Sequence, residues 1–393
     1  MERRSIILRL LSSAILFTGI ITIMLVYITS SNLKLAAHFT SKSYHVNHHL
    51  AAQMRCKEYK SIAFNVTNQS SSSYRNYWTS KQFNESDNYD FNTSYSAIKK
   101  ALYSLRRLLP HKLVILIENQ TMKKKKLITK QRRQRIKWRK KQEQSRDDFK
   151  ALSITLIQNA KWKEVPKIYS TVPKKRSCAV IGNSGILLNS SCGCEIDSHE
   201  FVLRSNIAPI LGFEKDVGYT HGFVSLNLEL SQIATSCLKN SSNPCFEEMV
   251  NRFKVYDQSI IWLSKLSGKP SKKTYLGVLS QLQKHNINPK IAYPFTSIGT
   301  RIISLWNITN PSSGLYLYTV AASLCDDISL YGFYPFYTSS DGTQLKHHYY
   351  ENRSMDYAKS HRMPEEFKLF TVLHKFGFIR LVLDRCSQDS RRL

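Results

Sequence analysis

Four short blocks in the C-terminal half of the chain contain residue types that could do chemistry together. Two are turns of small and polar residues, and two carry histidines and carboxylates. In chain order they are Gly182-Asn183-Ser184-Gly185, Ser312-Ser313-Gly314, His348-Tyr349-Tyr350-Glu351, and His361 with Glu366. The turns could hold a phosphate or a ribose, the tyrosines could form a wall, and a histidine suits the role of a base near neutral pH. Together the blocks favour glycosyl transfer.

Each block taken alone has a simpler explanation. The segment Gly182 to Gly185 fits an ordinary strand-to-helix turn, in which Ser184 could cap the next helix. His361 and Glu366 could simply begin a helix, and the tyrosines of the third block could be core aromatics. The chain contains neither GxGxxG nor GxxxxGK(S/T), so a dinucleotide or NTP-hydrolysis site has no support.

The elements that must position these blocks alternate in type from about residue 161 onward. Short β-rich runs predict strands at Cys178–Ile181, Phe201–Leu203, Phe223–Leu226, Ser259–Leu263, Lys290–Tyr293, Ile328–Gly332 and Phe378–Leu383. Helix-period patterns predict helices at Lys273–His285, Gly314–Leu324 and Pro364–Phe376. This alternation predicts an α/β fold with a mostly parallel sheet and helices on both faces. Ligands in such folds bind beyond the carboxyl ends of the strands, where the first turn is expected to lie.

The chain is strongly basic, with 57 Lys and Arg against 28 Asp and Glu and a formal net charge of +29 over 393 residues. Such a balance attracts nucleic acid, acidic lipid, or acidic sugars and nucleotides. Twelve of the cations lie in Lys123–Lys141. This polybasic run fits either capture of a polyanion or a solvated stem segment. Because no recognisable nucleic-acid module surrounds it, we do not expect nucleic acid as a partner.

The N-terminal segment predicts a membrane anchor. An apolar stretch at Leu10–Ile28 is close to the length that spans a bilayer, and Arg3 and Arg4 precede it. This arrangement predicts a single-pass type II protein with residues 1–9 in the cytosol, while a cleaved signal peptide is the alternative. Nine Asn-x-Ser/Thr sequons and eight cysteines agree with a secretory lumen.

The remaining residues divide into two predicted parts. Residues 29–160 are polar and poorly periodic, which predicts a luminal stem containing the polybasic run. Within this stem, a short helix at Ala97–Leu109 and a short strand at Leu113–Ile117 are expected. Residues 161–393 are expected to form the catalytic domain.

The four blocks and their surroundings resemble the motifs of the eukaryotic sialyltransferases. The segments CAVIGNSG, CGCEIDSHEFVLRSN and Asp216-Val217-Gly218 resemble the large sialyl motif, and Ser312 to Pro335 resembles the small one. The block beginning at His348 resembles the third motif, and the block beginning at His361 resembles the very small motif. The details HHYYEN, GFYPF and MPEEF are similar to the α-2,8 branch, which adds sialic acid to sialic acid.

The resemblance implies a fold, a reaction and a location. The fold would be a metal-independent variant of the GT-A type, a Rossmann-type sheet preceded by a transmembrane helix and a stem. The donor would be CMP-sialic acid, used with inversion and without metal or other cofactor. The acceptor would be a sialylated glycoprotein or glycolipid. The anchor would hold the protein in the Golgi membrane, and association into homo-oligomers is a further expectation.

The resemblance also implies roles for particular residues. His361 would be the general base, and His348 would stabilise the departing phosphate. Donor-binding positions would be Asn183, Ser184, Asn206, Ser313, Gly314 and Tyr334. Tyr349 and Glu366 would have supporting roles. The implied disulfides are Cys178–Cys325 and Cys192–Cys386. Cys237 and Cys245 are close enough in the sequence to clip one loop, and Cys56 with Cys194 is left as the remaining pair.

Some positions depart from the family pattern. Relatives usually carry Asn-Pro-Ser where this chain has Asn227-Leu228-Glu229, and Trp at the position of Tyr334. These departures leave open a catalytically impaired, glycan-binding homologue. A polysialyltransferase is a further alternative, but family members that build long chains carry a basic stretch before the small motif. Here Gln281 to Pro311 holds few cations, so transfer of one or a few sialic acids is favoured.

Overall fold

The computed structural model describes a defined set of residues: Cys56, 91–108, 115–117, 169–170, 172–264, 268–294, 298–352 and 361–386. Within this set, no helix has both the length and the apolar character needed to cross a membrane. The predicted anchor at residues 10–28 and the polybasic run lie outside the described residues.

A nine-stranded sheet with the order β2-β1-β7-β6-β5-β4-β3-β8-β9 organises the described domain. All neighbours from β7 to β9 pair in parallel, whereas β1 pairs antiparallel with β7 and with β2. The strands are β1 (Ile115–Ile117), β2 (Tyr169–Ser170), β3 (Lys175–Ile181), β4 (Phe201–Arg204), β5 (Phe223–Ser225), β6 (Ile260–Trp262), β7 (Lys290–Tyr293), β8 (Cys325–Tyr331) and β9 (Arg380–Val382). The seven strands predicted from residue 178 onward are all present, and they form the parallel part of the sheet.

The helices surround this sheet. They are α3 (Phe91–Leu108), α7 (Gly193–Ser198), α8 (Glu214–Val217), α9 (Leu228–Cys237), α10 (Phe246–Val255), α11 (Gly268–Lys284), α12 (Ile298–Trp306), α13 (Ser313–Leu324) and α14 (Met363–Lys375). The three helices predicted in the catalytic domain correspond to α11, α13 and α14. Sequence periodicity missed α9, which begins where Asn227 caps it by accepting a hydrogen bond from the N–H of Leu230 at 2.8 Å. The departure at Asn227-Leu228-Glu229 is therefore the start of a helix.

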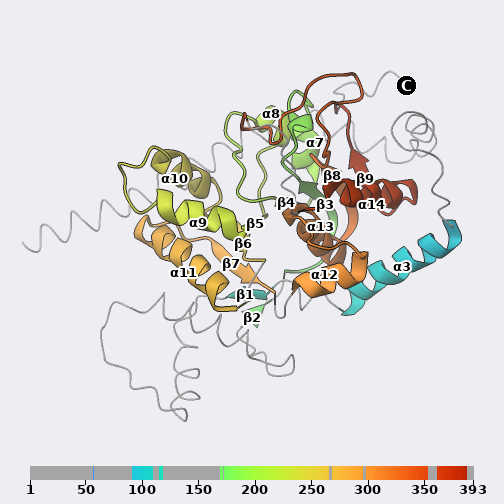
Figure 1. Ribbon diagram of the computed structural model, residues 1–393, viewed down its shortest axis with the longest axis horizontal. Helices are drawn as coiled ribbons and strands as arrows, with labels where there is room; N and C mark the ends of the chain where they lie inside the picture. Colours follow the sequence, from blue (N-terminus) through green and yellow to red (C-terminus); the bar gives the residue numbers. More distant parts are fainter. Residues whose placement is uncertain are drawn as a thin grey trace, which may run out of the picture. The chain divides into compact units, whose positions relative to one another are not determined.

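The two faces of the sheet are covered by different groups of helices (Figure 1). Successive strand residues point to opposite faces, so Cys178 and Val180 join a core cluster with α13 and α14, while Ala179 and Ile181 join another with α7. The chain steps in one direction from β3 to β7 and returns through α12 and α13 to β8. Right-handed crossovers therefore put α9 and α11 on the face opposite α13 and α14. Every residue of α13 from Leu315 to Leu324 is buried, since this helix lies across the centre of the sheet.

Two elements that the sequence analysis assigned to the stem join this domain. Strand β1 pairs with β7, and helix α3 packs on α13 through the buried side chains of Leu102 and Leu105. The guanidinium of Arg106 donates hydrogen bonds to the carbonyls of Cys325 and Asp326, at 3.3 and 2.9 Å. The helix predicted over residues 97–109 is longer at its N-terminus, because it starts at Phe91. The sheet thus extends into the segment assigned to the stem.

Four disulfides cross-link the domain. They join Cys56 to Cys194, Cys178 to Cys325, Cys192 to Cys386, and Cys237 to Cys245. The second connects β3 with β8 directly, and the third ties the C-terminal segment after β9 to the start of α7. The described structure thus joins the two pairs that the resemblance implied, the pair expected from its close spacing, and the remaining pair.

The order of the strands fixes where a ligand can bind. Strand β3 lies between β4 and β8. The chain leaves β3 towards α7 on one face and leaves β8 towards α14 on the other. Loops that leave adjacent parallel strands in opposite directions open a crevice at the carboxyl ends of those strands. The residues after Ile181 and after Tyr331 line this switch point.

Candidate active site

The turns after β3 and β8 interlock at the switch point. The N–H of Gly182 donates to the carbonyl of Tyr331 at 2.7 Å, and the N–H of Ser184 donates to the carbonyl of Gly332 at 3.2 Å. A Cβ atom on Gly182 would stand 2.3 Å from the carbonyl oxygen of Gly332, and Gly332 itself has a φ of +72°. Both positions therefore require glycine. The hydroxyl of Ser184 accepts a hydrogen bond from the N–H of Ile186 at 3.3 Å, which is the capping role that the sequence left open.

Two asparagines at the switch point have buried side-chain oxygens. Among the described residues, none donates a hydrogen bond to the side-chain carbonyl oxygen of Asn183 or of Asn206. The amide group of Asn183 donates to the carbonyl of Ser205 at 3.5 Å, so the two residues lie on adjoining turns. Leaving a buried acceptor unpaired costs about 1–3 kcal/mol. This pair therefore offers two acceptors to a ligand that carries N–H or O–H donors.

The turn after β4 stores backbone strain next to this pair. Asn206 has a φ of 52° and Ile207 a φ of 42°. Asparagine tolerates this left-handed region, whereas a β-branched residue there is an outlier that its surroundings must hold in place. The N–H of Asn206 donates to the hydroxyl of Ser225 at 3.2 Å, and Arg252 donates to the carbonyl of Ile207 at 3.0 Å. These contacts fix the direction in which Asn206 presents its amide.

The loop that carries the third block is pinned to the same turns. The N–H of Gly185 donates to the carbonyl of Lys346 at 3.1 Å, and the N–H of Tyr349 donates to the carbonyl of Asn183 at 2.9 Å. The phenol of Tyr349 donates to the carbonyl of Pro209 at 2.5 Å, and burial raises its pKa well above its usual value. Tyr349 is therefore a neutral, buried strut. This is the core-aromatic role that the sequence left open.

His348 is held from both sides. Its Nδ1 is hydrogen-bonded to the carboxylate of Glu351, and its ring stacks on Tyr350 with centroids 5.3 Å apart. The guanidinium of Arg252 in turn lies over the ring of Tyr350, 5.2 Å from its centroid. A carboxylate at one ring nitrogen orients an imidazole and stabilises its doubly protonated form. Sequence reasoning assigned no role to Arg252; nothing in a single sequence relates it to a tyrosine in a distant loop.

His361 lies just before α14, and its tautomer follows from its partner. Its Nδ1 is 2.9 Å from the carbonyl oxygen of Asn310. Because a carbonyl can only accept, Nδ1 must carry the hydrogen, which leaves the lone pair of the neutral ring on Nε2. The ring is partly exposed. Asn310 precedes the Ser312-Ser313-Gly314 turn, so His361 is bonded to the loop that leads into α13.

The N-terminus of α13 is organised by Glu366. Its buried carboxylate accepts from the N–H of Ser312 at 2.7 Å and from the hydroxyl of Ser312 at 2.5 Å. The same hydroxyl accepts from the N–H of Leu315 at 3.2 Å and so caps the helix. The N–H groups of Ser313 and Gly314 have no acceptor inside the helix. A helix start of this kind attracts a phosphate.

Tyr334 occupies a different environment from the other predicted donor-binding residues. Its ring is 4% exposed, and its hydroxyl donates to the carbonyl of Thr338 at 2.9 Å. It packs edge-on against Phe336 and Phe367. The structure therefore places Tyr334 in the core beneath the turn that follows β8. Asn183, Asn206 and the start of α13 lie around that turn.

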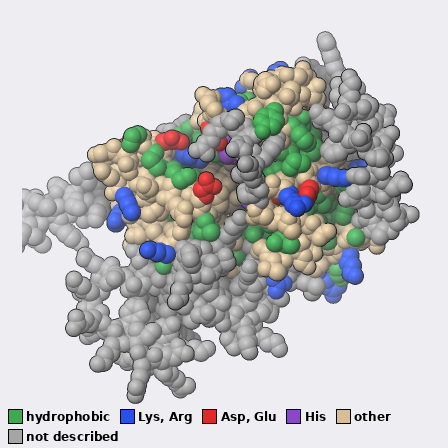
Figure 2. All heavy atoms as spheres, viewed as in Figure 1, with side chains coloured by type: hydrophobic (Ala, Val, Ile, Leu, Met, Phe, Trp, Pro, Cys, Tyr) green, Lys and Arg blue, Asp and Glu red, His purple; other side chains and the backbone are tan. Residues whose placement is uncertain are grey.

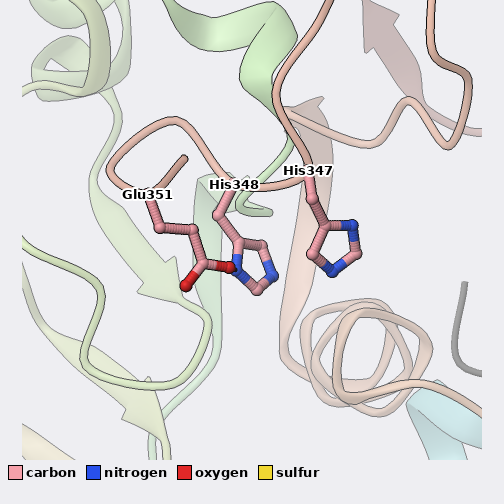
Figure 3. Close-up of side chains that lie close together, drawn as sticks. All are labelled: His347, His348 and Glu351. Carbon is pink, nitrogen blue, oxygen red and sulfur yellow. The ribbon is translucent and has the colours of Figure 1, made fainter. Parts of the chain in front are cut away.

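One group of side chains could hold a metal ion. The ligand atoms of His347, His348 and Glu351 all lie within 4.8 Å of one another (Figure 3).

On the face of the molecule that Figure 2 shows, the Lys and Arg side chains of the described residues are scattered among other side chains and do not form one large patch.

The site defines the class of protein before any comparison. A mostly parallel sheet with glycine turns, unpaired amides and a helix start at its switch point is typical of enzymes that bind nucleotides or their sugar derivatives. A family model described as glycosyltransferase family 29 (sialyltransferase) matches residues 115–378 of the chain. The chain belongs to this family, and the resemblance seen in its sequence is confirmed.

Two curated relatives have the same printed name, alpha-N-acetylneuraminide alpha-2,8-sialyltransferase. The protein from Xenopus tropicalis is 32% identical over 224 residues, which cover 56% of this chain and 63% of the relative. The protein from Bos taurus is 33% identical over 221 residues, which cover 55% of this chain and 61% of the relative. The matched stretch thus spans less than two thirds of either relative. A crystal structure of a mammalian sialyltransferase is 22% identical, with a TM-score of 0.41, over 72% of this chain and 94% of that chain.

Proposed function

We propose that this chain transfers sialic acid from CMP-sialic acid to a sialylated glycan in α-2,8 linkage, with inversion at the anomeric carbon. The fold would be the metal-independent GT-A type, and the protein would work as a type II protein of the Golgi membrane. Family membership supports the sugar, and the printed names of the two relatives support the linkage. The observation that carries the proposal is the pair of held imidazoles, His361 on Asn310 and His348 on Glu351.

The donor would lie across the switch point. The cytidine and sugar offer O–H and N–H groups, which suit the unpaired amide oxygens of Asn183 and Asn206. The phosphate would meet the N–H groups of Ser313 and Gly314 at the start of α13. Ser184 and Tyr334 are supporting parts of this arrangement, because each uses its hydroxyl within the protein.

The reaction breaks one bond to the anomeric carbon and forms another. The bond from that carbon to the phosphate oxygen breaks and its electron pair leaves with CMP, so the sugar becomes oxocarbenium-like. The acceptor hydroxyl attacks from the opposite face while Nε2 of His361 takes its proton. The doubly protonated His348, stabilised by Glu351, donates a hydrogen bond to the charge that develops on the phosphate. A phosphate monoester is a stable anion, so this departure needs no metal ion.

A turnover assay tests the proposal. CMP release would be measured with CMP-sialic acid and either sialylated or asialo acceptors, for the full chain and for His361→Gln. We expect turnover with the sialylated acceptor and a loss of about 10²–10⁴-fold in the variant. His285→Gln is the matched control, since that ring also contacts a backbone carbonyl, that of Leu238 at 3.1 Å, but directly follows the C-terminal end of α11. Turnover unchanged in His361→Gln would refute the assigned base, and no turnover with any acceptor would favour the impaired, glycan-binding homologue.

A further inference from the structure

Three potential metal ligands converge in the loop between β8 and α14. The ligand atoms of His347, His348 and Glu351 lie within 4.8 Å of one another, and all three residues are partly buried. In Figure 3 the carboxylate of Glu351 meets one side of the His348 ring, and the ring of His347 lies on the other side. The centroids of the two imidazoles are 4.1 Å apart. Two imidazoles and one carboxylate are thus gathered in one small volume that solvent can reach.

The backbone holds these three residues in place without any ion. The carbonyl of Lys346 and the N–H of Tyr349 are bonded to the turn after β3, on either side of the two histidines. The N–H of Glu351 donates to the carbonyl of His348 at 3.3 Å, which turns the carboxylate back towards the imidazole. A ligand set that is fixed before binding loses little conformational entropy when the ion arrives.

The chemistry of the donors selects the ion. Mg²⁺ and Ca²⁺ bind oxygen ligands, whereas imidazole nitrogen favours zinc and neighbouring transition metals. Two histidines with one glutamate and an open fourth position is a known arrangement for zinc. We propose that His347, His348 and Glu351 bind one divalent transition metal ion, such as Zn²⁺, and that the bound ion inhibits the transferase.

Inhibition follows from the part that His348 plays in the proposed function, on which this second half of the inference rests. A ring nitrogen that is bound to a metal ion cannot carry a proton at the same time. The nitrogen that would donate a hydrogen bond to the departing phosphate is then occupied by the ion.

The binding half is tested without any turnover measurement. The full chain, free of a polyhistidine tag and treated with a chelator, would be titrated with Co²⁺ and its visible absorption recorded, and Zn²⁺ binding would be followed by calorimetry. We expect one ion per chain. His347→Gln should weaken binding by more than about 100-fold, since even partners outside the ligand shell contribute 10–100-fold. His285→Gln, with a histidine removed elsewhere, should bind as the wild type does.

The inhibitory half is tested by CMP release with and without Zn²⁺. We expect wild-type turnover to fall with Zn²⁺ and to recover with a chelator, while His347→Gln keeps its basal turnover at the same Zn²⁺ concentration. His347→Ala provides a second variant if the glutamine lowers the melting temperature. Absence of Co²⁺ binding, or equal binding by the wild type and both His347 variants, would overturn the site. Binding that leaves turnover unchanged would overturn the inhibition. An inactive chain that still binds Co²⁺ through His347 would refute the proposed function and leave the metal site standing.

Discussion

The carboxylate of Glu366 accepts two hydrogen bonds from Ser312, one from its N–H at 2.7 Å and one from its hydroxyl at 2.5 Å. Both residues are buried, and 54 residues of chain separate them. The pair sets the start of α13 against the first turn of α14. Because His361 lies just before α14 and is bonded to Asn310 just before α13, the same pair also sets the position of the proposed base.

Glu366→Gln should therefore lower both stability and turnover. An amide in place of the carboxylate keeps the shape but turns one of the two acceptor oxygens into a donor group facing Ser312. We expect a loss of about 1–3 kcal/mol in the free energy of unfolding, measured by urea denaturation. Glu365→Gln is the control, because Glu365 is exposed and pairs with Arg362 across one turn, which contributes at most about 0.5 kcal/mol. Equal stability of the two variants would contradict the structural role of the contact between Glu366 and Ser312.

Gly182→Ala should be among the most damaging small substitutions in the domain. The added Cβ would stand 2.3 Å from the carbonyl oxygen of Gly332, which is backbone and cannot rotate away. We expect the turns after β3 and β8 to separate. The free energy of unfolding should fall by about 1–3 kcal/mol or more, as at other overpacked sites, and donor binding should be strongly reduced. In Gly277→Ala the Cβ would lie 3.3 Å from the side chain of Thr235, and helix propensity should offset this tighter contact. Measurements of melting temperature and CMP binding distinguish the two variants. A Gly182→Ala protein that binds CMP normally would refute the close packing of the turns after β3 and β8.

The sequence was informative where a local pattern decides the outcome. The strands from β3 to β9 are short runs of β-branched and apolar residues, and the residues of the turn at Gly182 are consecutive in the sequence. Helix α13 was visible because an apolar run follows the Ser312 cap. In each case, the interactions that define the element lie within a few residues of one another.

The parts that the sequence did not reveal depend on distant contacts. Strand β1 has three residues, and its place in the sheet depends on pairing with β7, more than 170 residues away. The contact of His361 with Asn310 has a separation of 51 residues, and that of Arg252 with Tyr350 spans almost twice as many. Tyr334 was expected to bind the donor because of its position in a sequence motif, but that position did not show that its ring would be buried. Side-chain direction in a turn is set by the packing around it.

The disulfides offer a test that depends on loop length alone. The bond between Cys192 and Cys386 spans 194 residues, and that between Cys237 and Cys245 spans 8. In the chain-entropy model, the longer loop contributes about 5 kcal/mol and the shorter about 2–3 kcal/mol. Replacing each pair by serines and measuring guanidinium denaturation should show the larger loss for the first pair. A larger loss for the Cys237–Cys245 pair would mean that native-state interactions at that loop outweigh the entropy of the unfolded chain.

His199 should make the stability of the domain depend on pH. Its ring lies against Tyr331, and its Nδ1 contacts the backbone carbonyl oxygen of Glu195. The side-chain carboxylate of Glu195 accepts hydrogen bonds from the phenol of Tyr331 and from Arg380. Burial lowers the pKa of His199 below its usual value, although the carbonyl and the charge of Glu195 oppose this effect. The native ring is therefore neutral at a pH where the unfolded chain, with a histidine pKa of roughly 6.5, takes up a proton.

The sign follows from proton uptake. Where the unfolded state binds more protons, stability rises with pH. The contribution of His199 is thus fully present above about pH 6.5 and is lost as the pH falls from there towards the lower native pKa. Melting temperatures measured between neutral and mildly acidic pH should fall in the wild type and fall less in His199→Phe, which keeps a ring against Tyr331 but cannot take up a proton. His285→Gln leaves His199 in place and should retain the wild-type slope. An identical slope in His199→Phe would show that another group governs the acid response.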